Sequence, residues 1–122
     1  MEIIKELTKV ELEMMKILWQ TDKAFLSDIV NAIPEPRPAY TTVSTVIRIL
    51  VKKGYVAYKQ YGKIHCYYPL ITKEEYAFFA MNRMKSNFFG DSVSNMISFF
   101  AKKEKISDAE KAEIVELLNS QD

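Results

Sequence analysis

The sequence predicts a mainly α-helical protein with one small β-hairpin. Apolar residues recur at helical spacing in three segments before residue 54, and a second set of helical patterns occupies residues 72–122. Between these two sets, two tyrosine-rich strand patterns flank a glycine turn. Three helices followed by a hairpin within about 70 residues is the order of a winged helix-turn-helix, so we expect that fold followed by a helical region.

The first two helices are predicted over residues 8–20 and 26–33, joined by a short apolar link at 24–26. Thr8 and Glu11 have the spacing of a capping box. The apolar residues around them predict a core-facing stripe: Leu7, Val10, Met14, Ile17 and Leu18. The second pattern ends at Pro34, and the three prolines of residues 34–38 predict a loop because proline has no amide donor.

The third helix is predicted to begin at Tyr40 and to end at Gly54, a residue that suits a left-handed terminating position. Its apolar face is expected to be Val43, Val46, Ile47, Leu50 and Val51. Strands are predicted over 55–60 and 64–70, on either side of a three-residue turn at Tyr61-Gly62-Lys63. In a winged helix-turn-helix the third helix reads DNA and the hairpin is the wing.

Three further helices are predicted in residues 72–122. Thr72 with Glu75, and Ser107 with Glu110, have capping-box spacing, and Asp91 or Ser92 is expected to cap the helix between them after a break at 87–90. We therefore expect a winged-helix DNA-binding domain at 1–71 and a helical dimerisation domain at 72–122.

The C-terminal helices carry an aromatic-rich apolar face that one copy would leave partly in water. We predict that a homodimer covers this face. The alternative is an intrachain core packed on the winged helix. The residues expected at the dimer interface are Phe79, Phe88, Phe89, Val93, Met96, Ile97, Phe100, Ile114, Leu117 and Leu118.

Positive charge is concentrated in residues 36–70. This block holds six Lys and Arg residues and no acidic residue, whereas residues 1–35 and 71–122 each have an excess of acidic residues. Such a block repels itself, and an anionic partner such as the phosphate backbone explains why it is tolerated. The alternative interpretation is a solvated charged face.

The polar face of the third helix is rich in hydroxyl and basic side chains. Hydroxyl groups and arginine can contact phosphates and base edges in the major groove. The predicted DNA contacts are Thr41, Thr42, Ser44, Thr45, Arg48 and Lys52 on the helix, with Lys59 and Lys63 on the wing. A solvent-exposed face without function is the alternative, although so many Ser and Thr residues weaken a helix.

The sequence offers little support for catalysis. Its one histidine and one cysteine, His65 and Cys66, are adjacent on a predicted strand and therefore point to opposite faces. No zinc-binding pattern or glycine-rich phosphate loop occurs, so we expect no enzyme, no metal and no cofactor. The lone cysteine and the lack of a signal-like or membrane-spanning apolar run predict a cytoplasmic protein.

Four segments of the chain resemble the BlaI/MecI penicillinase-repressor family. They are Leu-Glu-Met-Met-Lys-Ile-Leu-Trp at 12–19, Thr-Thr-Val-Ser-Thr-Val-Ile-Arg-Ile-Leu at 41–50, Lys-Lys-Gly-Tyr-Val at 52–56 and Tyr-Tyr-Pro-Leu at 67–70. The resemblance implies a homodimeric transcriptional repressor of β-lactam-resistance or related genes, which binds palindromic operators with TACA/TGTA half-sites through the third helix.

The resemblance also implies release from DNA by proteolysis. In the family a membrane sensor metalloprotease cuts the fifth helix, often at an Asn-Phe bond, which here corresponds to Phe99-Phe100. This chain departs from the family pattern at Phe99, and both residues could instead be part of a core. No cysteine follows Cys66, so the paired-cysteine tail of copper-responsive relatives is missing. A different function, a winged-helix module that binds proteins rather than operators, remains the alternative.

Overall fold

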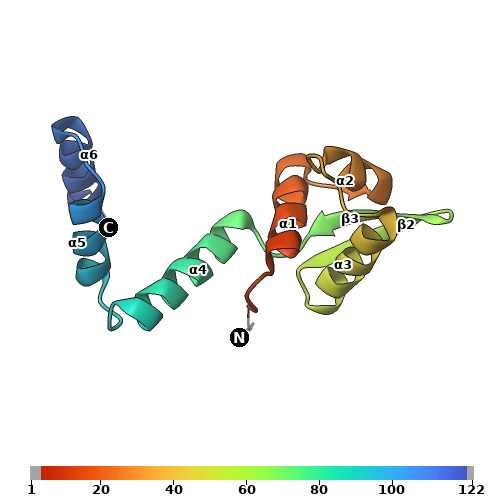
Figure 1. Cartoon of the computed structure of the whole chain (residues 1–122), viewed down its shortest axis with the longest axis horizontal. Coiled ribbons are helices and arrows are strands. Elements are labelled where there is room, and N and C mark those ends of the chain that lie inside the picture. Colours follow the sequence, from red (N-terminus) through yellow and green to blue (C-terminus); the bar gives the residue numbers. More distant parts are fainter. Residues whose placement is uncertain (1–3, 121–122) are drawn as a thin grey trace. The chain divides into compact units, whose positions relative to one another are not determined.

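The computed structural model of the chain describes residues 4–120, so the outermost residues of the two predicted domains lie outside it. The described residues form six α-helices and one three-stranded antiparallel sheet (Figure 1). In chain order these are α1 (Lys9–Thr21), β1 (Ala24–Phe25), α2 (Leu26–Ala32), α3 (Tyr40–Lys52), β2 (Val56–Tyr61), β3 (Ile64–Pro69), α4 (Lys73–Phe88), α5 (Val93–Lys103) and α6 (Asp108–Asn119). Two compact units meet between Ala80 and Met81, inside α4.

The first unit is a winged helix-turn-helix, which confirms the predicted fold class. Helices α1, α2 and α3 pack on one another and on a sheet with the strand order β1-β3-β2 (Figure 1). The β2–β3 hairpin is the wing. Its core is built from the inward faces of all these elements, with Met14, Leu18, Ile29, Ile47 and Tyr55 fully buried.

The inward face of α1 differs from the predicted stripe. Val10, predicted to face the core, is 40% exposed, whereas Glu11 and Met15, which the stripe did not include, are buried. The sequence pattern assigned Glu11 only to the capping box. Its carboxylate can be buried because Lys53, at the C-terminal end of α3, binds it with both Nζ–Oε distances at 2.8 Å.

The wing has a shorter turn than predicted. Tyr61 pairs with Ile64, so the loop contains only Gly62 and Lys63, and Gly62 has a φ of +61° that favours glycine. Residues 24–26, expected to be a link, include the short strand β1, which pairs Ala24 with Tyr67. A two-residue strand is too short to show any periodicity, which explains why the sequence pattern missed it.

Four helices begin at hydroxyl side chains, as predicted. Thr8 and Thr72 form complete capping boxes with Glu11 and Glu75. At α5 it is Ser92, not Asp91, that accepts the first-turn amide, from Asn95. Ser107 accepts the Glu110 amide, and within the described chain only this half of the third box is formed.

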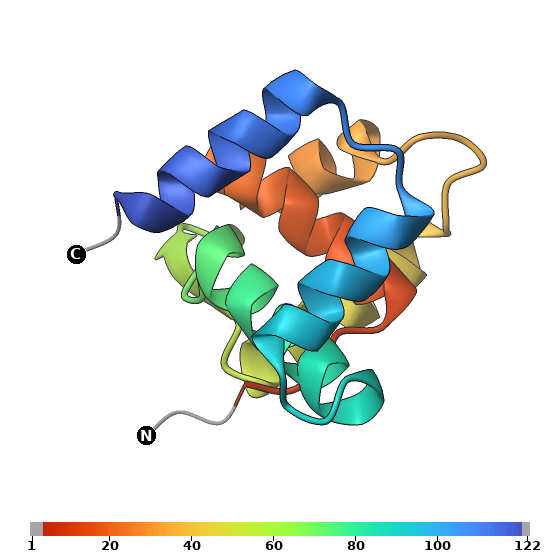
Figure 2. The same ribbon diagram turned by 90° about the vertical axis from the view of Figure 1, so that its left-hand side faces the viewer.

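The described residues of the second unit, 81–120, have no core of their own. Helix α4 continues to Phe88, two residues into the predicted break, and short loops connect it to α5 and α5 to α6 (Figure 2). None of the residues described in α4, α5 or α6 is buried. No helix among residues 4–120 has the length and apolar character needed to cross a membrane.

Candidate nucleic-acid interface

Helix α3 presents a polar face on the side opposite its buried residues. Val43, Ile47 and Leu50 are completely buried, which fixes the rotation of the helix on the core. The structure consequently brings the predicted DNA-contact residues of α3 to one surface. Ser44 is half-buried, and the other five are exposed: Thr41, Thr42, Thr45, Arg48 and Lys52.

Arg48 lies along the surface of its own helix. Its Nε donates to the Ser44 carbonyl at 3.4 Å and a terminal nitrogen donates to Thr45 Oγ1 at 3.5 Å. Both distances are at the long end of the hydrogen-bonding range. The guanidinium is therefore oriented by α3 but weakly held, and it can turn toward an incoming base or phosphate at little cost.

The loop before α3 is held by another member of the basic block. Arg37 donates from Nε to the Ile33 carbonyl at 2.8 Å and from a terminal nitrogen to the Asn31 carbonyl at 3.1 Å, so it closes the end of α2. The loop leads to Ala39, the N-cap of α3, which supplies no side-chain acceptor to the first turn.

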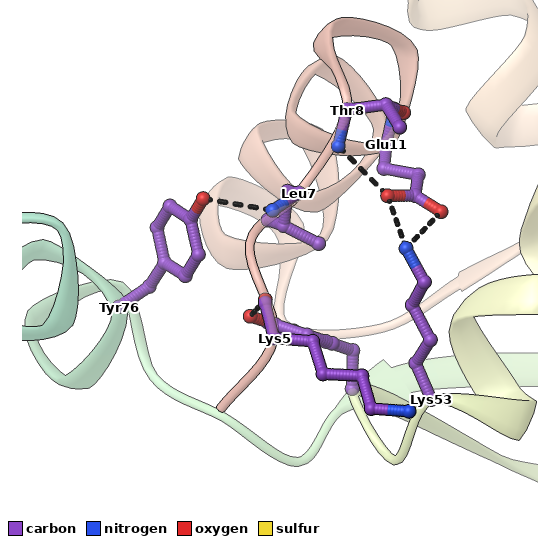
Figure 3. A network of polar contacts seen from close by, with 7 residues as sticks. Lys5, Leu7, Thr8, Glu11, Lys53 and Tyr76 are labelled. Atoms are coloured by element: carbon purple, nitrogen blue, oxygen red, sulfur yellow. Dashed lines mark hydrogen bonds and ion pairs between the residues drawn. The ribbon is translucent and has the colours of Figure 1, made fainter. Parts of the chain in front are cut away.

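Lys53 also serves the fold rather than the polar face of α3. Figure 3 shows its side chain reaching from the end of α3 to the Glu11 carboxylate, which also accepts the Thr8 amide at 2.8 Å. Burial raises the pKa of Glu11, but the Lys53 ammonium and the Thr8 hydrogen bonds outweigh it, so the net pKa lies below its ordinary value. The sequence analysis did not identify this ion pair.

Four cations of the basic block remain available to a ligand. Arg37 and Lys53 are bound to groups of the first unit, whereas Arg48, Lys52, Lys59 and Lys63 are exposed. Lys63 lies in the wing turn, and Lys59 Nζ lies 5.8 Å from the centre of the exposed Tyr61 ring. All four belong to the predicted set, and α3 and the wing that carry them are adjacent in the first unit.

One face of the wing carries an aromatic cluster that the sequence analysis did not single out. Tyr58 stacks on His65 at a centroid distance of 4.1 Å and an interplanar angle of 12°, and both rings contact Tyr67 edge-on. Burial raises the pKa of Tyr67, as do Tyr58 and Tyr40, while Arg48 opposes the shift. Tyr67 and Val56 of this face share the buried core with Val43 and Ile47 of α3, so this face of the wing lies toward α3. The sequence signal for this cluster was the two-residue spacing of positions 58 and 60 on one strand and of 65 and 67 on the other, which places all four on one face.

The predicted dimer and cleavage residues lie in α4, α5, α6 and the loop after α4, and none of them is buried. Phe88 is 76% exposed and Phe100 is 62% exposed, whereas Phe79, Phe89, Met96 and Ile114 are half-buried. Phe99 contacts Phe89 at a centroid distance of 5.4 Å. No cluster of three or more metal-ligating side chains occurs among residues 4–120.

Comparison with known proteins places this architecture in a family. The model of the penicillinase repressor family matches residues 7–120. The penicillinase repressor of Bacillus licheniformis is 22% identical over 97% of this chain and 93% of its own length. The methicillin resistance regulatory protein MecI of Mammaliicoccus sciuri is 27% identical over 93% of this chain and 94% of its own.

Solved structures support the same assignment for the first unit. The solution structure of the DNA-binding domain of the repressor BlaI aligns with a TM-score of 0.55 at 25% identity, covering 62% of this chain and 94% of that one. The monomeric form of Bacillus licheniformis BlaI, solved in complex with the blaP half-operator, aligns with a TM-score of 0.52 at 25% identity over the same shares of the two chains. The chain therefore belongs to the penicillinase repressor family, a family of DNA-binding transcriptional repressors and not of enzymes.

Proposed function

We propose that this protein represses transcription by binding a palindromic operator as a homodimer, with α3 in the major groove and the wing on the adjacent backbone. The observation that carries the proposal is the surface of α3, where exposed hydroxyl groups flank Arg48. Arg48 is proposed to read a base, because arginine can bind guanine bidentately in the major groove. Lys52, Lys59 and Lys63 are proposed to neutralise phosphates. The half-operator complex of BlaI supports DNA as the partner.

A titration with DNA from the region upstream of the gene tests this proposal. Binding should resist an excess of random duplex, weaken with salt because phosphate contacts release counterions, and protect a palindrome with half-sites one helical turn or a multiple apart. Binding that random duplex removes equally would instead favour the protein-binding winged-helix module, since that module requires no operator.

A homodimer is the second part of the proposal, and the lack of any buried residue in α5 and α6 supports it. Within the second unit, an open cavity of about 720 Å³ is lined by Met84, Phe88, Phe89 and Phe99 together with polar residues. A palindromic operator has two half-sites, each of which binds one copy of α3. The proposed occupant of this cavity is therefore a second copy of the chain. Sedimentation should give twice the 14.2 kDa chain mass. A single 14.2 kDa species at micromolar concentration would contradict it.

Two charge variants sharpen the test of dimerisation. Ile97 is 47% exposed and shares a helix face with the predicted dimer residues Val93 and Phe100, so Ile97→Asp should produce monomers. Ala112→Asp adds the same charge to α6, on the side opposite the predicted dimer residues of that helix, and should leave the dimer intact. Operator affinity should fall only for the first variant.

Relief of repression by proteolysis, in response to β-lactams, is the third part of the proposal. The Phe99–Phe100 bond lies in the middle of α5, and cleavage there would separate α6 and half of α5 from the DNA-binding unit. Because this bond departs from the Asn-Phe pattern, mass spectrometry should be used to identify where the chain is cut. After exposure of cells to a β-lactam, the expected fragment ends at Phe99. An intact chain under derepressing conditions would contradict this part alone.

A further inference from the structure

His65 is the only histidine of the chain and has no role in the fold's polar network. It lies on β3, where it pairs across the strand with Gln60, and its ring is held between Tyr58 and Tyr67. Within the described chain, neither imidazole nitrogen has a hydrogen-bond partner. The ring is thus fixed in orientation, and its nitrogens are open to solvent, since among the described residues no buried side-chain nitrogen lacks a hydrogen-bond partner.

The groups around His65 favour an anionic partner. Tyr58 and Gln60 share its face on β2, and Tyr67 lies beside it on β3, in the same buried core as Val43 and Ile47 of α3. The carboxylate of Asp28 in α2 is bound to the backbone amide of Phe25 at 3.1 Å. Residues 36–70 contain no acidic side chain.

We propose that His65 is a DNA-binding residue that donates from its imidazole to a backbone phosphate between α3 and the wing, so that operator affinity depends on pH. The inference rests on the proposed operator binding. A stacked imidazole is already ordered, so little conformational entropy is lost when it meets the phosphate. A protonated imidazole binds a phosphate more strongly than a neutral one, and binding therefore takes up a proton. Affinity rises as the pH falls.

A salt titration at two pH values tests the proposal. One additional charged phosphate contact from each of the two proposed copies steepens the slope of log K against log salt by about 1.8, which makes affinity fall roughly twelvefold further between 50 and 200 mM salt. We expect this difference between the wild type and His65→Phe at about pH 5.5 and equal slopes at about pH 8. Phenylalanine keeps the stack on Tyr58, so the comparison isolates the proton. His65→Gln, which keeps a neutral donor, should follow His65→Phe.

Proton uptake gives an independent measurement on the unmodified protein. Calorimetry of operator binding near neutral pH, in two buffers of different ionisation enthalpy, should show uptake in the wild type and less in His65→Phe. Equal slopes at both pH values, or equal uptake, would overturn the role of His65. Failure of the repressor proposal gives a different result. Random duplex would then compete as effectively as the operator, while the pH-dependent difference in slope between the wild type and His65→Phe would persist.

Discussion

Removal of the ammonium that binds Glu11 tests how the ends of α1 and α3 are held together. In Lys53→Met the carboxylate, whose side chain is only 5% exposed, loses two hydrogen bonds of 2.8 Å but keeps the Thr8 amide. Hydrogen bonds to charged groups contribute roughly 1.5–3 kcal/mol each, and breaking a fully buried pair costs roughly 3–5 kcal/mol. Because the Lys53 side chain is 24% exposed and Glu11 retains one donor, we expect a loss of about 2–3 kcal/mol.

Urea unfolding at fixed protein concentration measures this loss, and the chain supplies its own control. Lys16 and Glu13 form an ion pair at 3.4 Å whose side chains are 58% and 47% exposed, so Lys16→Met should change the free energy of unfolding by less than about 0.5 kcal/mol. Equal effects of the two substitutions would refute the reasoning that burial makes the first pair important.

The same variant should change the dependence of stability on pH. In the wild type the folded pKa of Glu11 lies below its unfolded value, so this residue contributes stability above the unfolded pKa that is lost as the pH falls through the folded one. In Lys53→Met the ammonium that lowers the folded pKa is lost, so this pKa rises and the pH-dependent contribution of Glu11 to stability shrinks. The difference in stability between the two proteins should therefore be largest near pH 7 and small near pH 3.

Three further predictions concern the core, the reader and the wing. Met14→Ala removes a completely buried side chain and should destabilise the first unit by about 2–5 kcal/mol in urea unfolding, whereas Val10→Ala should cost less than about 1 kcal/mol. Arg48→Ala should lower operator affinity by about 1–3 kcal/mol for each half-site while random duplex binding changes little, and an equal loss on both would assign Arg48 to a phosphate. Lys63→Ala, in the exposed wing turn, should weaken operator and random duplex alike and reduce the salt slope of the dimer by about 1.8; an unchanged slope would place Lys63 away from DNA.

Local patterns predicted the parts of the fold that local forces determine. Val43, Ile47 and Leu50 are buried as their spacing indicates, because a helix of 13 residues can bury only one stripe. The capping boxes of Thr8 and Thr72 formed because each involves residues three apart in the chain.

Contacts between distant residues were beyond the reach of the sequence patterns. The burial of Glu11 depends on a partner 42 residues away, and no periodicity encodes that pairing. The stack of Tyr58 on His65 depends on strand register, which a turn one residue shorter than predicted determines. Apolar spacing alone does not indicate the partner of the C-terminal helices, so the dimer residues stay a prediction.

The missing side-chain cap of α3 links the stability of the protein to its affinity for DNA. Four other helices receive a hydroxyl acceptor at the N-terminus, each contributing about 1 kcal/mol, but Ala39 offers none. A serine at this position would stabilise the unliganded protein by occupying the amides that a phosphate can otherwise accept from. A serine cap and a bound phosphate therefore compete for the same backbone amides of α3. In a repressor that depends more on occupancy of its operator than on its melting temperature, alanine is the more suitable residue.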